Sequence, residues 1–476
     1  MEKSNRFVEL YHYLQDPHLV ARFQRFCGVH GTFSRTVCAG TKDRTHSQNN
    51  GACHHHSAGN EGENLAVIGA GEGEIPTRKR VIDSEVANIS EKLPQNGAVV
   101  STATAGGETV GLGSNGRRVA GATEPEQREK ESGAPGCSTV KPRRKNSLTG
   151  DAGQEFLIQN RFLYYMFTFG TELGNELFYI TFFPFVIWSI DAFVGRRLIM
   201  VWVWVMYLGQ CTKDVLGWSR PASPPVVKVE VFYNSEYSMP STHAMSGTAI
   251  PFSLFFMTYG RWEYSFTLGF SLALCWCLLV CVSRIYMGMH SVLDVIAGVV
   301  YSSLILLFFL PVMDLIDDFN LTCRYAPLII ISLHLGLGLF SFTLDTWSTS
   351  RGDTAQILGT GAGIALASHV NHYLGLMPDP TPDQLPFTTP ALSASLFGVA
   401  VLRLVLGVLV LMTTRALMKT ITIPAVCWVF RVPSADVRKA RQHMEVELPY
   451  RYIVYGAVGF NVVFLVPLLF SYIHLS

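Results

Sequence analysis

The sequence has few charged residues for its length, and this scarcity excludes most classes of soluble protein. Only 15% of its 476 residues are Asp, Glu, Lys or Arg, whereas soluble globular proteins contain about 25%. Hydrophobic residues make up 49% of the chain and the mean hydropathy is +0.26. Neither a soluble protein with a single core nor a disordered protein fits this composition.

Other features that would point to particular classes are also lacking. The 10 Cys residues show no spacing typical of a disulfide framework or a zinc site. The net charge of +1 gives no basic field that would favour nucleic acid. No cluster of carboxylates indicates a Mg²⁺ site, and the first 30 residues lack the apolar segment of a cleavable signal peptide. We therefore expect no metal, no cofactor and no nucleic-acid partner.

The few charges are unevenly distributed, since residues 1–150 hold 35 of the 73 charged side chains. Residues 30–154 are rich in Gly, Ser, Thr and Ala, and we predict a largely disordered polar region there. Its basic run before Ser147 makes that serine a candidate phosphorylation site. Residues 1–29 predict two short amphipathic helices on either side of Pro17. These helices either lie on a bilayer surface or pack on the rest of the protein.

Long apolar segments follow residue 155, and a bilayer-spanning helix needs about 20 mostly apolar residues. The pattern predicts an all-α fold, a polytopic membrane bundle of about nine helices, with a range of eight to ten. We divide it into a membrane core over 155–315 and C-terminal transmembrane helices over 316–476. The predicted spans lie near 172–194, 197–215, 243–259, 264–283, 290–311, 326–344, 354–375, 395–413 and 452–473.

Polar residues gather at the ends of the second to fifth predicted spans, where charges are costly and therefore informative. Counting the spans places all of these helix ends on one membrane face. The clusters are Lys213 with Arg220-Pro221, Pro240-Ser241-Thr242-His243, and Ser283-Arg284 with His290 and Asp294.

These clusters contain the groups needed to bind and transfer a phosphate. Lys213, Arg220 and Arg284 supply three cations, and Arg matches phosphate oxygens in bidentate geometry. The N-terminus of the third span adds free backbone N–H groups, and Ser241 adds a hydroxyl.

Two histidines can perform the chemistry. His290 and Asp294 are four residues apart and share one helix face, so Asp294 can accept the Nδ1–H of His290 and leave Nε2 as a nucleophile. His243 comes from another helix and can protonate the leaving alkoxide.

Three motifs in these clusters resemble those of the phosphatidic acid phosphatase type 2 superfamily. They are K-x6-RP from Lys213, PSxH from Pro240, and SR-x5-H-x3-D from Ser283. The second usually reads PSGH; the variant PSTHAMSGTAIP is similar to the sphingosine-1-phosphate phosphatase family, as are GQCTKD, SRIYMGMHS and RKARQHMEVELPYRY. The segments LQDPHLVARFQRFCGV and RRKNSLTG resemble the first of that family's two paralogues.

The resemblance implies a six-helix phosphatase core and a metal-independent phosphoric monoester hydrolase of the endoplasmic reticulum membrane, acting in sphingolipid metabolism and signalling. Its expected substrates are sphingosine-1-phosphate and dihydrosphingosine-1-phosphate. The implied roles are a phosphohistidine on His290, orientation of that ring by Asp294 and proton transfer by His243. The implied phosphate-binding residues are Lys213, Arg220, Ser241, Thr242 and Arg284.

Two alternatives remain open at this point. The first is a broader lipid phosphate phosphatase acting on phosphatidic and lysophosphatidic acid, because the motifs do not distinguish the headgroups. The second is a membrane anion transporter, which predicts charges near the bilayer midplane. The membrane face is also open, since the basic loop 415–451 favours a cytosolic active site, whereas the family resemblance favours a luminal one.

Overall fold

The computed structural model of the protein describes residues 2–31, 138–140 and 156–475, apart from gaps at 231–235, 345–349, 377–378, 389–392 and 434–435. Ser147 and most of the polar region expected over residues 30–154 lie outside the described residues. The described chain is predominantly helical, which confirms the predicted all-α class.

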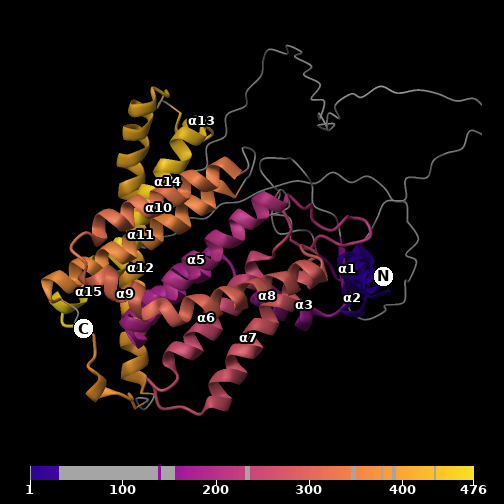
Figure 1. Ribbon diagram of the computed structural model, residues 1–476, viewed down its shortest axis with the longest axis horizontal. Coiled ribbons are helices and arrows are strands. Elements are labelled where there is room, and N and C mark those ends of the chain that lie inside the picture. Colours follow the sequence, from indigo (N-terminus) through magenta and orange to yellow (C-terminus); the bar gives the residue numbers. More distant parts are fainter. Residues whose placement is uncertain are drawn as a thin grey trace, which may run out of the picture. The chain divides into compact units, whose positions relative to one another are not determined.

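The helix α5 (Ala192–Leu216) lies between two groups of helices (Figure 1). It packs against α6 on one side and α11 on the other, and α11 packs in turn against α14. The other helices of the two groups are α3 (Arg161–Glu172), α4 (Glu176–Phe185), α6 (Thr242–Thr258), α7 (Phe266–Tyr286), α8 (Val292–Phe309), α9 (Met313–Thr322), α10 (Ala326–Leu344), α11 (Arg351–Leu374), α12 (Ala394–Phe430), α13 (Val437–Ala440), α14 (Met444–Val463) and α15 (Leu465–Tyr472).

The number of membrane spans is close to the predicted range. Among the described residues, six helices or continuous helix pairs are long and apolar enough to cross a bilayer. The number is seven if the bent pair formed by Arg161–Glu172 and Glu176–Ile190 counts as one span. The two other predicted spans are helical as well, namely α6 and α11. The helix α6 has only 17 residues, and α11 contains many small and polar residues that are buried against other helices. The predicted total of nine spans is therefore not confirmed.

The first predicted span is not a single straight helix. The helix α3 ends at Glu172, and α4 begins at Glu176 and continues into a π-helical turn, η1 (Val186–Ile190); the two parts meet at 66°. The break contains Gly174 and Asn175, and the Asn175 side chain donates a hydrogen bond to Glu172. This break brings a polar loop into the membrane domain beside the start of α6.

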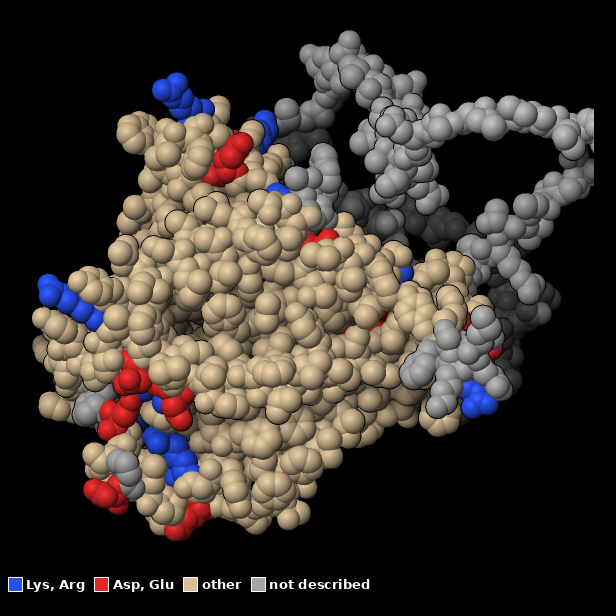
Figure 2. Space-filling view, viewed as in Figure 1, with Lys and Arg blue, Asp and Glu red and all other residues tan. Residues whose placement is uncertain are grey.

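A broad apolar surface surrounds the helices. Figure 2 shows a wide area without Lys, Arg, Asp or Glu, with the charged residues near its edges. The helix α12 has much of its apolar surface uncovered, including Phe397 at 73% and Leu409 at 62% exposure. Such a surface on a helix of 37 residues is suited to contact with lipid.

The N-terminal helices are α1 (Glu2–Gln15) and α2 (Pro17–Phe26). Of the two alternatives, the structure has α2 packed on the protein, with Val20, Ala21 and Gln24 buried and with contacts to α7. The chain then enters a small antiparallel sheet in the order β1-β3-β2, formed by β1 (Val29–Gly31), β2 (Ser138–Val140) and β3 (Phe156–Ile158).

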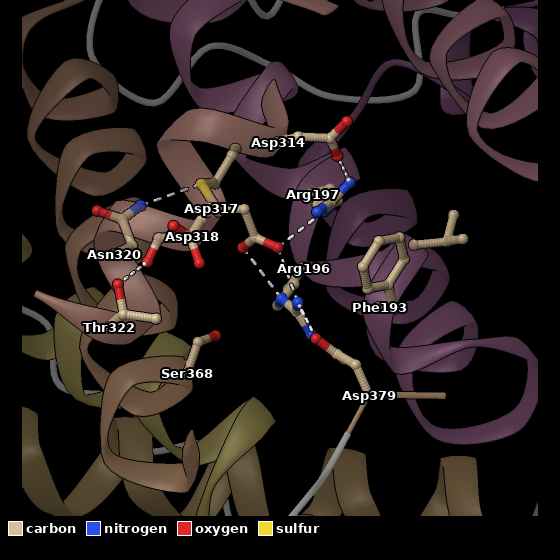
Figure 3. A network of polar contacts seen from close by, with 12 residues as sticks. Phe193, Arg196, Arg197, Asp314, Asp317, Asp318, Asn320, Thr322, Ser368 and Asp379 are labelled. Carbon is tan, nitrogen blue, oxygen red and sulfur yellow. Dashed lines mark hydrogen bonds and ion pairs between the residues drawn. The ribbon is translucent and has the colours of Figure 1, made fainter. Parts of the chain in front are cut away.

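A second group of charges lies at the N-terminal end of α5. The Arg196 guanidinium lies between Asp317 of α9 and Asp379, and both pairs are bidentate (Figure 3). Arg197 contacts Asp317 and Asp314. This network joins α5, α9 and the segment after α11. The network lies about 25 Å along α5 from Lys213, so charged residues gather near both ends of this helix.

Candidate active site

The three predicted phosphate-binding cations come from the ends of two helices and the loop between α5 and α6. Lys213 lies in the last turn of α5, Arg284 in the last turn of α7, and Arg220 in the loop. Their side chains are 2%, 1% and 4% exposed, respectively. Each of the three interacts with another part of the same polar cluster, so the structure brings together what the span count predicted.

The N-terminus of α6 lies within this cluster. Ser241 is the N-cap, and its hydroxyl accepts a hydrogen bond from the N–H of Ala244. Its own O–H therefore remains able to donate to an anion. Thr242 is the first helical residue, and its hydroxyl accepts a hydrogen bond from Lys213 Nζ at 3.1 Å. The helix thus begins two residues after Pro240, at Thr242.

His290 lies in the turn between α7 and α8 with its two ring nitrogens facing different partners. Nε2 lies 3.3 Å from Nη1 of Arg220, and Nδ1 lies 3.4 Å from the hydroxyl of Ser238. Nδ1 is 3.8 Å from Oδ2 of Asp294, which is too far for a hydrogen bond. The direct bond expected from the sequence is thus replaced by one through Ser238, whose hydroxyl donates to Asp294 at 2.6 Å.

Asp294 is held in place by its own helix. Its Oδ2 accepts the N–H of Ser291, and its backbone N–H donates to the hydroxyl of Ser291, which makes a capping box at the start of α8. The backbone carbonyl of Asp294 also accepts the N–H of Ser241. This last bond joins the α8 terminus, which carries His290, to the α6 terminus, which carries His243.

The surroundings of His290 favour its neutral form. Burial lowers the pKa of His290 well below its ordinary value of 6.5, and the positive charges of Arg220, Arg284 and Lys213 lower it further. A neutral imidazole at neutral pH is the form required for nucleophilic attack. Burial also lowers the pKa of Arg220, to about 10, so that this residue remains a cation at neutral pH.

His243 is oriented by the break between α3 and α4. Its Nε2 lies 3.1 Å from Oδ1 of Asn175, an oxygen that can only accept, so this nitrogen carries a proton. The ring packs so tightly on Gly174 that a Cβ at this position would collide with Cδ2 of His243. Sequence reasoning missed Asn175 because we placed it inside a continuous span.

Two carboxylates next to the cations were also missed. Oε2 of Glu236 lies 3.3 Å from Lys213 Nζ and 3.6 Å from Nη2 of Arg220. Oε2 of Glu230 lies 2.9 Å from Nη1 of Arg284. Both residues belong to the loop before α6, which has no periodic pattern, so the sequence offered no signal for them.

The loops of the site are fastened by the N-terminal helix α2. The Gln24 side chain is 1% exposed and donates to the carbonyls of Val227 and Tyr286, while its Oε1 accepts the N–H of Val227. Gly288 has a φ of +71° and lies directly against the carbonyl of Val227, so only glycine fits there. The segment carrying Arg220 and the turn carrying His290 are thereby held together.

The cluster has donors available for an anion. Arg284 is fully buried, and its Nε has no hydrogen-bond partner in the described part of the chain, so a phosphate oxygen could supply one. Within the described residues, no group of three or more His, Cys, Asp or Glu side chains could hold a metal ion. The arrangement offers three cations, a helix N-terminus, a neutral imidazole with Nε2 free, and a second imidazole whose Nε2 carries a hydrogen.

Comparison with known proteins identifies the family of this chain. A model described as the PAP2 superfamily matches residues 181–316. Over the full length of both chains, the protein is 53% identical to sphingosine-1-phosphate phosphatase 1 of Mus musculus. The chain belongs to the sphingosine-1-phosphate phosphatase family. No solved structure matches it.

Two further relatives refine the assignment within the sphingosine-1-phosphate phosphatase family. Identity is 64% to sphingosine-1-phosphate phosphatase 1 of Rattus norvegicus, over 70% of this chain and 77% of the relative. It is 38% to sphingosine-1-phosphate phosphatase 2 of Homo sapiens, over 68% of this chain and 81% of the relative. The predicted resemblance to the first paralogue is therefore confirmed. The superfamily match includes all eight predicted catalytic and phosphate-binding residues, but it begins after Asn175.

Proposed function

We propose that this protein is a membrane-bound phosphoric monoester hydrolase that removes phosphate from sphingosine-1-phosphate and dihydrosphingosine-1-phosphate. One observation supports the catalytic assignment most strongly. Nε2 of His290 lies 3.3 Å from Arg220, toward the cations, while its other ring nitrogen faces Ser238 and Asp294. The nucleophilic nitrogen is therefore directed to the place where those cations would hold a phosphate.

In the first step, Lys213, Arg220 and Arg284 hold the phosphate oxygens and offset the charge that develops on them. Nε2 of His290 attacks phosphorus, the bond from phosphorus to the ester oxygen breaks, and a phosphohistidine forms. His243, in its doubly protonated cationic form, supplies the proton on Nε2 to the departing alkoxide. Asp294, acting through Ser238, stabilises the positive charge on the His290 ring.

In the second step, the now neutral His243 takes a proton from water, and the water oxygen attacks phosphorus. The bond between phosphorus and Nε2 breaks, inorganic phosphate leaves, and both histidines return to their starting states. Ser241, Thr242 and the N-terminus of α6 supply further donors to the phosphate through both steps. No step requires a metal or a cofactor.

The lipid substrate follows from the family and the apolar surface. The relatives are named for sphingosine-1-phosphate, and the helices that carry the site lie beside surface suited to lipid. A purified full-length protein in detergent micelles should release phosphate from sphingosine-1-phosphate with a kcat/KM far above that for glycerol phosphate. Equal values would contradict a lipid phosphatase, and a clear preference for phosphatidic acid would favour the broader alternative.

We also assign the enzyme to the endoplasmic reticulum membrane, and its C-terminus offers a way to determine the catalytic face. Arg403 donates to the carbonyls of Leu475 and Trp188, which places the C-terminus at the Arg196 end of α5. The catalytic cluster lies at the other end. A glycosylation tag at the C-terminus that becomes modified would place the catalytic end in the cytosol, and an unmodified tag would place it in the lumen. Fractionation with organelle markers tests the compartment.

A further inference from the structure

The phosphate-binding cations of this site are already countered by carboxylates from the loop before α6. Glu236 faces Lys213 and Arg220, and Glu230 faces Arg284. The side chains of the two glutamates are 14% and 17% exposed, so these pairs lie largely away from water. A site that only had to attract phosphate would gain nothing from negative charges at this position.

The charges of the site explain what the carboxylates can do. Three cations face two carboxylates, and a phosphate monoester brings about −1.5 to −2 charges at neutral pH. Binding of a simple phosphate therefore leaves about one excess negative charge in a buried cluster, which is costly. A substrate that carries one positive charge beside its phosphate removes this excess.

The remaining charged groups nearby do not change this balance. Asp294 accepts hydrogen bonds from Ser238 and Ser291, and its charge offsets the positive charge of His243 before the proton transfer and that of His290 after it. Further out, Lys228 interacts electrostatically with Arg220, and Asp353 with Glu236 and Lys213, and the charges of Lys228 and Asp353 are of opposite sign.

Sphingoid-base phosphates have the required positive charge. Their ammonium group is borne by the carbon next to the one that carries the phosphate ester, so it must lie within a few ångströms of the bound phosphate. Phosphatidic and lysophosphatidic acids have no such group. The Lys213 ammonium, 3.3 Å from Glu236, illustrates that this carboxylate can take an ammonium as its partner.

We infer that Glu236 is a specificity-determining residue that pairs with the ammonium group of the substrate. The inference rests on the proposed function. Glu236 is the better placed of the two glutamates, because its Oε2 faces two of the phosphate-binding cations and its backbone carbonyl accepts Nε of Arg220 at 3.0 Å. When phosphate takes over these cations, the carboxylate is released beside it and is free to bind the ammonium.

The test compares two phosphates of matched chain length in the full-length protein. Glu236→Gln keeps the shape of the side chain and removes its charge. We expect kcat/KM for sphingosine-1-phosphate to fall by about 10–100-fold, as for loss of a hydrogen bond to a charged group. The value for lysophosphatidic acid should stay constant or rise, because the excess negative charge is gone. N-acetylation of the amine of sphingosine-1-phosphate should lower kcat/KM of the wild-type protein. The kcat/KM of the Glu236→Gln protein should be nearly the same for the acetylated and the unmodified substrate.

Several outcomes would overturn the inference. Equal losses for both lipids would mean that Glu236 only positions Lys213 and Arg220, and equal gains would mean that it obstructs the phosphate site. Glu445→Gln, at an exposed residue of α14, is the matched control and should change neither value. A wild-type protein that cleaves no sphingosine-1-phosphate would contradict the proposed function itself, which is a separate result.

Discussion

The hydroxyl of Ser238 donates a 2.6 Å hydrogen bond to Asp294 and lies 3.4 Å from Nδ1 of His290, so it connects the carboxylate to the imidazole. The carboxylate itself is 3.8 Å from Nδ1. Ser238 can accept the Nδ1–H because its own proton goes to Asp294. The orientation of the proposed nucleophile thus depends on a serine in the loop before α6, as well as on its own helix.

The first prediction concerns this serine. Ser238→Ala should lower kcat by roughly 10–100-fold, the equivalent of a hydrogen bond to a charged group. KM should change little, because Ser238 does not contact the cations that hold phosphate. Ser238→Thr should restore part of the rate, and Ser302→Ala, at a buried serine of α8, should have no effect on kcat. A raised KM at constant kcat would contradict a positioning role.

The second prediction separates the two histidines. His290→Ala should abolish both turnover and phosphoenzyme. His243→Ala should lower turnover of the lipid by about 10²–10⁴-fold, the range of general acid–base catalysis. With nitrophenyl phosphate, whose leaving group needs no proton, the loss should be milder. Acid-labile phosphate trapped on the His290→Ala protein would show that the nucleophile lies elsewhere.

The third prediction follows from the lowered pKa of His290. Arg220→Gln removes a neighbouring positive charge, so the pKa of His290 should rise toward its ordinary value of 6.5. Since only the neutral ring attacks, the acidic limb of the kcat/KM profile should move to higher pH in the variant. Both proteins are assayed with the same lipid, so the ionisation of the substrate affects both pH profiles equally and does not contribute to the difference between them. An unmoved limb would mean that Arg220 does not influence the nucleophile.

The sequence predicted those parts of the site that follow from helix ends. Lys213, Arg284 and Asp294 occupy terminal turns of apolar helices, and charges there are conspicuous in a membrane chain. Because successive spans cross the membrane in opposite directions, counting the spans was sufficient to place these residues on one membrane face.

The residues that were missed follow no such rule. Ser238 and Glu236 lie in an irregular loop, whose path depends on tertiary contacts such as those of Gln24 with Val227. Asn175 lies at a break between two helices, and counting apolar residues does not detect this break because the segment is apolar on both sides of it. The pair Gly174-Asn175 inside an apolar segment is nevertheless a local signal for such a break. The network around Arg196 was missed because its carboxylates come from segments far apart in the sequence.

The fourth prediction concerns metals. Three cations and the N-terminus of α6 supply the positive charge that a phosphatase otherwise takes from Mg²⁺. Activity of the purified enzyme should therefore survive EDTA, and vanadate should inhibit it as a phosphate-like anion that can become five-coordinate. Activity lost in EDTA and restored by Mg²⁺ would contradict this.

The fifth prediction concerns the charge network at the far end of α5. Asp317 has a side chain 1% exposed and accepts hydrogen bonds from both Arg196 and Arg197. Asp317→Asn leaves the buried Arg196 and Arg197 paired only with the more exposed Asp379 and Asp314. It should lower the free energy of unfolding by about 3–5 kcal/mol, read as a lower thermal midpoint in detergent. Asp314→Asn is the matched control, because that side chain is 85% exposed and its pair should contribute no more than about 1 kcal/mol. The kcat of the folded Asp317→Asn protein should equal that of the wild type, since the network lies at the other end of α5 from Lys213. Equal midpoint shifts for the two variants would mean that burial does not decide the strength of these pairs.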